Sequence, residues 1–394
     1  MTSTETQYTT ALLLRAVASG DTDDVSRLLD KGADITAHFP DGLDLLAMAV
    51  RHGHDQLARV LHDRMYPSVA SVAATDVRFE GLDRLDSGRF YEVQKGVYND
   101  APVAVKQPHH FSPRSSRTLR EDAQLQKTIR SPYVLPLLAT VDLDSKKPQL
   151  ITEFMDQGNV LDYLRKKREG EHVAVEVTTV QVAWVIANAL QDLHRQSIIH
   201  RNVESRKVLL STTHGVKFSG FTYARTVVGL KTANVGTMLS MAPEVLRRDY
   251  EEEAASADIY SFGVVLTELD KGNAPYANSG DFSFEMARRV GDGSLRPTMS
   301  PNCVPWLREL ADRCLAADPA ERPTASDIVA ILAQHLDATD TCINVPPAPS
   351  QQLLYSGPKS SFQPTMETTP TLIKYVQSSA SQLRVSATLF VVAS

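Results

Sequence analysis

Residues 198–210, IIHRNVESRKVLL, carry the strongest structural signal in the chain. Apolar residues at both ends, Ile198-Ile199 and Val208–Leu210, enclose a polar loop that begins with His200 and Arg201. Six further short segments stand around this loop in a fixed order: VAVK ending at Lys106, ITEFM ending at Met155, KFSGFTYAR at 217–225, MAPEVL at 241–246, ADIYSFGVVLTEL at 257–269, and Arg322-Pro323. One such motif is weak evidence, but seven in register leave little room for chance.

Together these segments resemble the motifs of a protein kinase domain, most like those of the tyrosine-kinase-like group. The resemblance covers residues 79–337 and implies a bilobal α+β fold, with an N-lobe at 79–152, a hinge at 153–158 and a C-lobe at 159–337. The residue pattern agrees with this division. Short β-branched runs alternate with turns up to about residue 152, and long helical patterns follow, which indicates an α+β domain.

An internal repeat precedes this domain. The stretch LLLRAVASGDTDDVSRLLDKGAD begins at Leu12, and LLAMAVRHGHDQLARVLHDR begins at Leu45. Equivalent residues are 33 positions apart: Ala16 and Ala49, Gly20 and Gly53, Leu28 and Leu61. This period resembles the ankyrin repeat, so residues 11–64 are predicted to form an all-α, ankyrin-like segment. The alternative is a generic pair of helical hairpins.

Two such repeats bury too little apolar surface to be stable alone. We therefore expect them to pack on the neighbouring domain or on a partner protein. Composition suggests three irregular segments: a flexible N-terminus at 1–10, a linker at 65–78, and a disordered tail at 338–394 that is rich in Pro, Ser, Thr and Gln.

The bulk composition narrows the functional class. The chain has 394 residues, and 41 Lys and Arg against 47 Asp and Glu give a net charge of −6, so neither nucleic acid nor an anionic membrane is an expected partner. Three cysteines without metal-site spacing suggest neither a disulfide framework nor a zinc site. The first residues do not resemble a secretion signal and no apolar stretch reaches the length of a membrane span, so a cytoplasmic location is expected.

Five residues of the hinge region and its surroundings match positions that hold adenine in the family. The resemblance makes Thr152 the small residue before the hinge, places the backbone of Glu153 and Met155 opposite adenine, and sandwiches the ring between Ala104 and Leu209. An adenine-shaped pocket is therefore expected. The alternative is that these are simply packed core positions.

Lys106 matches the family lysine that contacts the α- and β-phosphates and pairs with a helix carboxylate. Its partner is expected within LREDAQLQKTIRSP. Counting back from Pro132 selects Asp122, and Glu121 is the other candidate. A purely structural ion pair is the alternative role for Lys106.

The glycine-rich loop of the family is degenerate here. The segment LDSGRFYEV places Asp86 and Tyr91 at the first and third glycine positions and keeps only Gly88. A Cβ obstructs the approach of phosphate, and the carboxylate of Asp86 would repel it. This loop is poorly suited to hold a triphosphate.

The catalytic loop has lost three chemical positions. Asn202 replaces the Asp that orients and deprotonates the substrate hydroxyl, and an amide cannot act as that base. Glu204 reverses the charge at a position where such kinases usually have a lysine. Lys207 replaces the Asn that helps to hold Mg²⁺.

The metal-binding triplet is also altered. Eighteen residues after Asn202, where the family has D-F-G, the chain has Gly220-Phe221-Thr222. Mg²⁺ requires oxygen ligands from the protein besides the phosphates. Both family ligands are absent here, the Asp at position 220 and the Asn at position 207. The sequence thus predicts no metal site and no Mg²⁺, while Lys207 leaves metal-free ATP binding open.

The positions that support the fold are retained. The resemblance implies a buried ion pair between Glu244 and Arg322, and a carboxylate at Asp258 that braces the backbone of the catalytic loop. The other members of this architectural set are His200, Arg201 and Phe221, which fold the loop and join the lobes.

Because the losses fall on chemical positions and the fold positions remain, the main hypothesis is a pseudokinase. Such a protein would act as a signalling scaffold that binds protein partners through the ankyrin-like repeats and the kinase-like surface. The alternative is an active or weakly active serine/threonine kinase that transfers the γ-phosphate of ATP to protein hydroxyls. The sequence leaves open whether the chain is an enzyme.

Overall fold

A computed structural model describes residues 3–79, 81, 83–109, 112–226, 240–247, 255–276 and 284–336. The predicted tail at 338–394 lies outside these residues. The predicted flexible N-terminus differs from the structure, because helix α1 (Ser3–Ser19) begins within it. The apolar run LLLRAV in the second half of α1 explains the difference, since burial of Leu13 and Val17 stabilises the helix.

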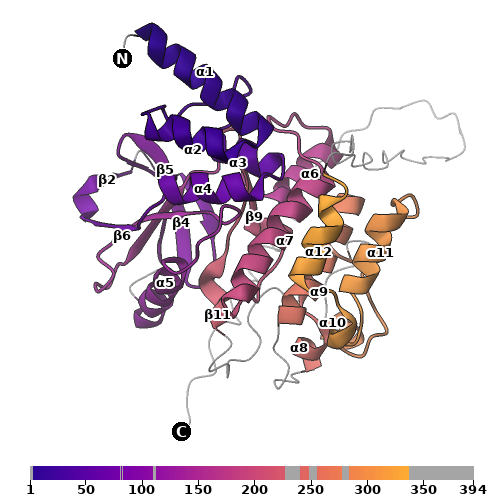
Figure 1. Cartoon of the computed structure of the whole chain (residues 1–394). Helices are drawn as coiled ribbons and strands as arrows, with labels where there is room; N and C mark the ends of the chain where they lie inside the picture. The colour runs from indigo at the N-terminus through magenta and orange to yellow at the C-terminus, as the bar shows by residue number, and fades with distance from the viewer. Residues whose placement is uncertain are drawn as a thin grey trace, which may run out of the picture. The chain divides into compact units, whose positions relative to one another are not determined.

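A seven-stranded sheet forms the first lobe (Figure 1). Its strands follow the order β1-β6-β7-β5-β4-β2, and β3 pairs with β4. The bounds are β1 (Ala70–Val72), β2 (Val77–Arg78), β3 (Arg84–Ser87), β4 (Tyr91–Tyr98), β5 (Ala101–Pro108), β6 (Leu137–Val141) and β7 (Gln149–Glu153). Helix α5 (Pro113–Gln126) packs on this sheet, with Leu119 and Ala123 fully buried.

The segment predicted to be a linker, residues 65–78, contributes two of these strands. Strand β1 pairs in parallel with β6, and β2 pairs with β4 at the other side of the sheet. The strands have three and two residues, so their period-2 pattern is too brief to be seen in the sequence. The segment therefore joins the helices to the sheet by backbone hydrogen bonds.

Helices dominate the second lobe, which confirms the predicted two-lobed α+β arrangement. They are α6 (Val160–Glu169), α7 (Thr179–Arg195), α8 (Pro243–Arg247), α9 (Ala255–Lys271), α10 (Phe284–Gly291), α11 (Pro305–Cys314) and α12 (Ala325–Ala333). Four short strands lie among them: β8 (Ile198–Ile199), β9 (Val208–Ser211), β10 (Gly215–Phe218) and β11 (Arg225–Thr226). None of the described helices has the length and hydrophobicity that a membrane span requires.

Helix α7 forms the centre of this lobe. Its start is fixed by a capping box, in which Thr178 Oγ1 accepts from the amide of Gln181 and Gln181 Oε1 accepts from the amide of Thr178, each at 3.0 Å. Apolar residues surround the helix on all sides, as expected of a helix that neighbours cover completely.

The N-terminal segment consists of two helical hairpins. They are α1 with α2 (Thr22–Asp30), and α3 (Leu45–Arg51) with α4 (Asp55–Met65). The two hairpin turns match: Gly20 and Gly53 have φ of +72° and +70°, a region that glycine enters without steric cost. The repeat of 33 residues in the sequence thus corresponds to a repeated turn geometry.

Helix α3 explains why these hairpins do not stand alone. Its first six residues, LLAMAV, are all buried, and a helix that is apolar on every side needs neighbours all round. The helix lies beside strand β10, and its capping residue Asp44 bonds to the β9–β10 turn, where the amide of Asp44 donates to the carbonyl of Thr213 at 2.9 Å. The hairpins therefore pack on the second lobe, one of the two outcomes expected from the sequence.

Polar contacts join helix α4 to both lobes. Arg59 donates to both carboxylate oxygens of Asp192 in α7, at 3.0 and 3.2 Å. The hydroxyl of Tyr133 donates to Asp55 at 2.9 Å. Because Asp192 is only 4% exposed, its charge depends on Arg59 for compensation.

We predict that Arg59→Ala lowers the free energy of unfolding of the whole chain by about 1–3 kcal/mol, since it leaves Asp192 buried without its partner. The value lies below that for fully buried pairs because the side chain of Arg59 is 33% exposed. Urea titration followed by circular dichroism measures the change. Arg64→Ala is the matched control: its pair with Asp30 is on the surface, so a loss below about 1 kcal/mol is expected. Equal losses in both variants would contradict the prediction.

Candidate functional site

A cleft of about 540 Å³ lies between the sheet and the second lobe. Its walls come from β3–β5, from the hinge and from β9. Most of the predicted nucleotide residues line it: Ala104, Lys106, Thr152, Glu153, Met155 and Leu209. Gly220 and Lys207 also line the cleft, whereas Gly88, Asn202 and Glu204 are not among its lining residues. The structure thus brings the adenine positions together.

Lys106 lies at the centre of a small buried network. Its Nζ is 2.5 Å from Oδ2 of Asp122 and 2.7 Å from Oγ1 of Thr222. Thr222 in turn donates to the same Asp122 oxygen at 3.1 Å. Glu121, the other candidate partner from the sequence, points elsewhere and contacts Arg225 at 3.4 Å. Asp122 is fully buried, so its charge is compensated by Lys106.

Tyr91 fills the space beneath the former glycine-rich loop. Its ring is 4.1 Å from Nζ of Lys106, in a cation–π contact. A Cβ added to Gly88 would lie only 2.6 Å from Cε1 of Tyr91, so the ring is packed directly against the loop. Burial is the main cause that raises the pKa of Tyr91 to about 12. The ring therefore occupies the region between Lys106 and the loop.

Lys207 covers Gly220. Position 220 has a φ of +99°, and a Cβ there would lie 2.7 Å from Cδ of Lys207. The ammonium group of Lys207 is 4.0 Å from Asp86 and 3.9 Å from Glu204. The three charges that the sequence places at degenerate positions thus meet in one cluster, with the cation in the middle.

Asn202 is buried and directs its amide nitrogen to Glu204 Oε1, at 3.2 Å. An amide that donates to a neighbouring carboxylate holds that carboxylate in place. This hydrogen bond links positions 202 and 204 within the loop. It supplies no basic oxygen at position 202.

The backbone of the loop is held by Asp258 from α9. Its carboxylate accepts hydrogen bonds from the amides of His200 and Arg201, both at 2.8 Å, and from His194 at 3.0 Å. Burial alone would raise the pKa of Asp258, but the hydrogen bond from His194 and the nearby positive charge lower it. Arg201 adopts a φ of +66°, an uncommon conformation for a residue other than glycine.

Two further contacts stabilise the second lobe. Arg322 forms a buried bidentate pair with Glu244, at 2.6 and 2.8 Å. His200 packs edge-on against Phe221, with 5.2 Å between ring centroids, and burial lowers its pKa to about 4. A neutral His200 fits this apolar stack.

Sequence reasoning missed a polar cluster on the outer side of the hinge. Oδ2 of Asp44 accepts from Nδ1 of His214 at 2.8 Å, and Oε1 of Glu153 lies 3.6 Å from the same nitrogen. The hydroxyl of Tyr66 donates to Glu153. No motif could have indicated this cluster, because its members come from distant segments and have no characteristic spacing.

The cleft is a poor match for a divalent cation. Gly220 supplies no side-chain ligand, and the aliphatic part of the Lys207 side chain occupies the space that a side chain at 220 would need. Within the described ranges, no group of three or more His, Cys, Asp or Glu side chains is arranged to hold a metal ion. Hard cations need several oxygen ligands, so the residues present do not fit Mg²⁺ held in the manner of the family.

The sequence model of protein tyrosine and serine/threonine kinases matches residues 79–332. The chain belongs to the protein kinase family. Similar proteins include the serine/threonine/tyrosine-protein kinase HT1 of Arabidopsis thaliana, 31% identical over 276 residues, and the serine/threonine-protein kinase STY46 of the same plant, 31% identical over 255 residues. A probable serine/threonine-protein kinase of Dictyostelium discoideum is 27% identical over 266 residues.

These alignments cover 66%, 62% and 66% of this chain, but 66%, 42% and 20% of the respective relatives. The match of the family model begins after the helical hairpins. Membership in the kinase family therefore applies to the two lobes, and the cleft corresponds to the nucleotide cleft of that family. The four N-terminal helices lie outside the matched range.

We predict that stability depends on the protonation of His214. Burial alone would lower the pKa of His214, but the hydrogen bond to Asp44 and the charge of Glu153 raise it. A raised pKa in the folded protein means that this contribution is fully present below the unfolded value of about 6.5 and is lost as the pH rises through the folded value.

The variant His214→Gln should therefore lose stability at acidic pH and show a flatter profile above about pH 6.5. Thermal unfolding at a series of pH values measures this. His52→Gln controls for the removal of a histidine as such, since His52 lies at an exposed site of the helical hairpins. A pH profile of His214→Gln that parallels the unmodified protein would refute the prediction.

Proposed function

We propose that this kinase-family chain is a pseudokinase that serves as a signalling scaffold. One observation carries the proposal: the ammonium-bearing chain of Lys207 covers Gly220, at the position where the family places its metal-binding carboxylate. Positive charge and bulk at this point oppose the binding of Mg²⁺. The amide at position 202 adds to this, because it lacks a basic oxygen for the substrate hydroxyl.

We further propose that the cleft retains recognition of adenine nucleotides without Mg²⁺. Members of the kinase family bind ATP, and the adenine side of this cleft keeps its aliphatic walls at Ala104 and Leu209. The phosphate side is less favourable, because Tyr91 packs beneath the loop and Asp86 brings negative charge to the cleft. Lys106 and Lys207 supply the positive charge available for phosphate.

The helical hairpins are proposed to be ankyrin-like repeats that bind protein partners. The support is the repeat of 33 residues together with the matching turns at Gly20 and Gly53. Because α3 and α4 pack on the second lobe, the surface for partners would come from α1 and α2. A cytoplasmic location is part of the same proposal.

A second candidate function is an active or weakly active serine/threonine kinase. The printed names of the similar proteins describe kinases, which favours this activity. The pair of Lys106 and Asp122 favours it as well, because active kinases require a lysine–carboxylate pair at this place. Direct measurement of phosphotransfer distinguishes the two functions.

We expect the purified chain of 394 residues to transfer no phosphate from ATP to itself or to a generic protein substrate, with either Mg²⁺ or Mn²⁺. The physical reasons are the missing base at 202 and the missing metal ligand at 220. Incorporation of labelled phosphate measures the activity. The variant Lys106→Ala separates genuine activity from contamination, because it removes the phosphate-binding ammonium. Metal-dependent transfer that Lys106→Ala abolishes would establish the kinase alternative.

Nucleotide binding is expected to raise the melting temperature by a few degrees at millimolar ATP, equally with EDTA and with Mg²⁺. The equality follows from the lack of a metal ligand at Gly220. Ala104→Phe, which narrows the adenine side of the cleft, should abolish the shift. A shift that requires Mg²⁺ would contradict the proposed metal-free binding, and no shift with either would restrict the function to protein recognition.

A further inference from the structure

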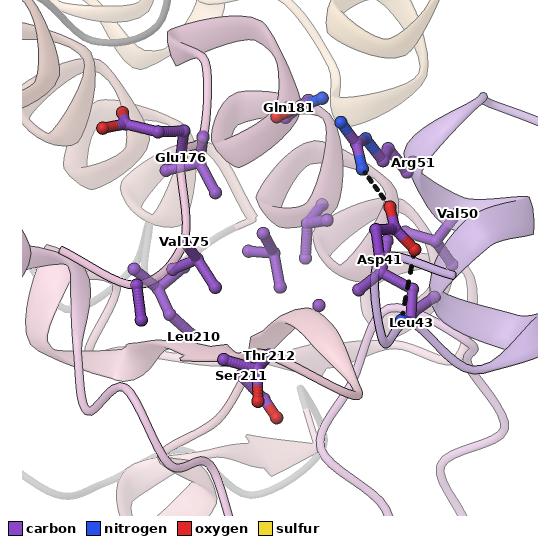
Figure 2. A pocket seen from close by; sticks show the side chains of 16 residues that line it. Asp41, Leu43, Val50, Arg51, Val175, Glu176, Gln181, Leu210, Ser211 and Thr212 are labelled. Carbon is purple, nitrogen blue, oxygen red and sulfur yellow. Dashed lines mark hydrogen bonds and ion pairs between the residues drawn. The ribbon is translucent and has the colours of Figure 1, made fainter. Parts of the chain in front are cut away.

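A second cavity, of about 300 Å³, lies between the N-terminal hairpins and the second lobe (Figure 2). Asp41, Leu43, Val50 and Arg51 stand on one side of it, and Val175, Glu176 and Leu210 stand on the opposite side. The two walls thus belong to segments far apart in the sequence. Neither segment forms the cavity alone.

The lining is mostly aliphatic. Six of its apolar residues are buried: Leu43, Ala47, Val50, Val177, Val185 and Leu210. The volume is at the lower limit of small-molecule sites and corresponds to at least about ten non-hydrogen atoms, at about 30 Å³ for each. Filling such a space with apolar atoms recovers contacts that its lining residues otherwise lack.

The charges at the rim already have partners. Asp41 pairs with Arg51 at 3.1 Å, and Glu176 pairs with Lys167 at 2.8 Å. A charged ligand would therefore enter the aliphatic space without a counter-ion of its own, at a high desolvation cost. The electrostatics favour an uncharged ligand.

The rim does offer hydrogen-bond donors. Among the described residues, the side-chain nitrogen Nε2 of Gln181 has no hydrogen-bond acceptor. Only one of the three guanidinium nitrogens of Arg51 has an acceptor. Both side chains lie at the same end of the cavity (Figure 2). They match a ligand with one acceptor oxygen, such as a hydroxyl or a carbonyl.

We propose that this cavity is a binding site for an uncharged, mainly aliphatic small molecule with one acceptor oxygen. The ligand would contact both walls and so stabilise the packing of the hairpins on the second lobe. This proposal does not depend on nucleotide binding or on phosphotransfer.

The site would also communicate with the cleft through strand β9. Leu210 faces the cavity, whereas its neighbour Leu209 faces the cleft, as alternation along a strand requires. The backbone of Leu210 bonds to the hinge at Gln157 and Gly158, at 3.0 and 2.8 Å. A ligand in contact with Leu210 would therefore act on a strand that is hydrogen-bonded to the hinge.

Octan-1-ol is a suitable probe, since it has about nine non-hydrogen atoms and one hydroxyl. Added near saturation to the whole chain of 394 residues, it should raise the melting temperature by about 3–8 °C. Octanoate and octylamine at the same concentration should shift it at least threefold less, because they carry a charge. Calorimetric titration of all three probes gives the affinities.

The variant Val175→Phe places a ring in the cavity and should weaken the binding of octan-1-ol at least tenfold. Val173→Phe is the matched control, because Val173 is a neighbouring, partly buried residue that does not line the cavity. If octan-1-ol gives no shift, if it binds Val175→Phe as well as the unmodified protein, or if the charged probes bind better, the proposal is overturned.

A second measurement needs no variant and so does not depend on the folding of Val175→Phe. Hydrogen exchange of the unmodified chain should slow by at least threefold at residues 41–51, 174–177 and 208–216 when octan-1-ol is present. Exchange in α8 and α10, which contribute no residue to the lining of the cavity, should not change. Uniform slowing over the whole chain, or none at the three segments, would reject the site.

Discussion

The arrangement of the loop that begins at His200 depends on one constraint, the carboxylate of Asp258. It accepts hydrogen bonds from the backbone amides of His200 and Arg201 and from the ring of His194. These bonds hold Arg201 in a left-handed conformation. Such a conformation persists only where surrounding contacts determine it. Asn202 and Lys207 follow in the chain after this anchored backbone. The start of the loop is thus held independently of the residues that would perform chemistry on it.

This independence explains how the cleft can keep its form while its charges change. The ammonium of Lys207 lies within about 4 Å of Glu204 and Asp86, so it offsets part of the negative charge of these two carboxylates. Tyr91 and Thr222 likewise satisfy Lys106 together with its partner Asp122. The altered positions therefore form a self-consistent polar network rather than a damaged one.

Sequence reasoning succeeded where spacing within one segment determines position. The resemblance of VAVK to the kinase motif predicted Lys106 as a residue of the cleft, and the ordered motifs predicted both lobes. It could not identify the contacts of Asp44 with His214, which are 170 residues apart in the sequence, because no local pattern encodes a pair that only tertiary packing creates. The sequence did not predict the strands within 65–78 for another reason. They consist of two or three residues each, and their stability comes from their neighbours in the sheet.

Strand β1 has a consequence for where this protein can be divided. The family match starts at residue 79, yet β1 completes the sheet beside β6, and the helices before it cover polar groups at the hinge. A chain shortened to the matched range would leave β6 as an unprotected edge, a known route to aggregation. It would also leave Glu153 and Asp192 without Tyr66 and Arg59. The range matched by the family model is therefore smaller than the unit that packs together in the structure.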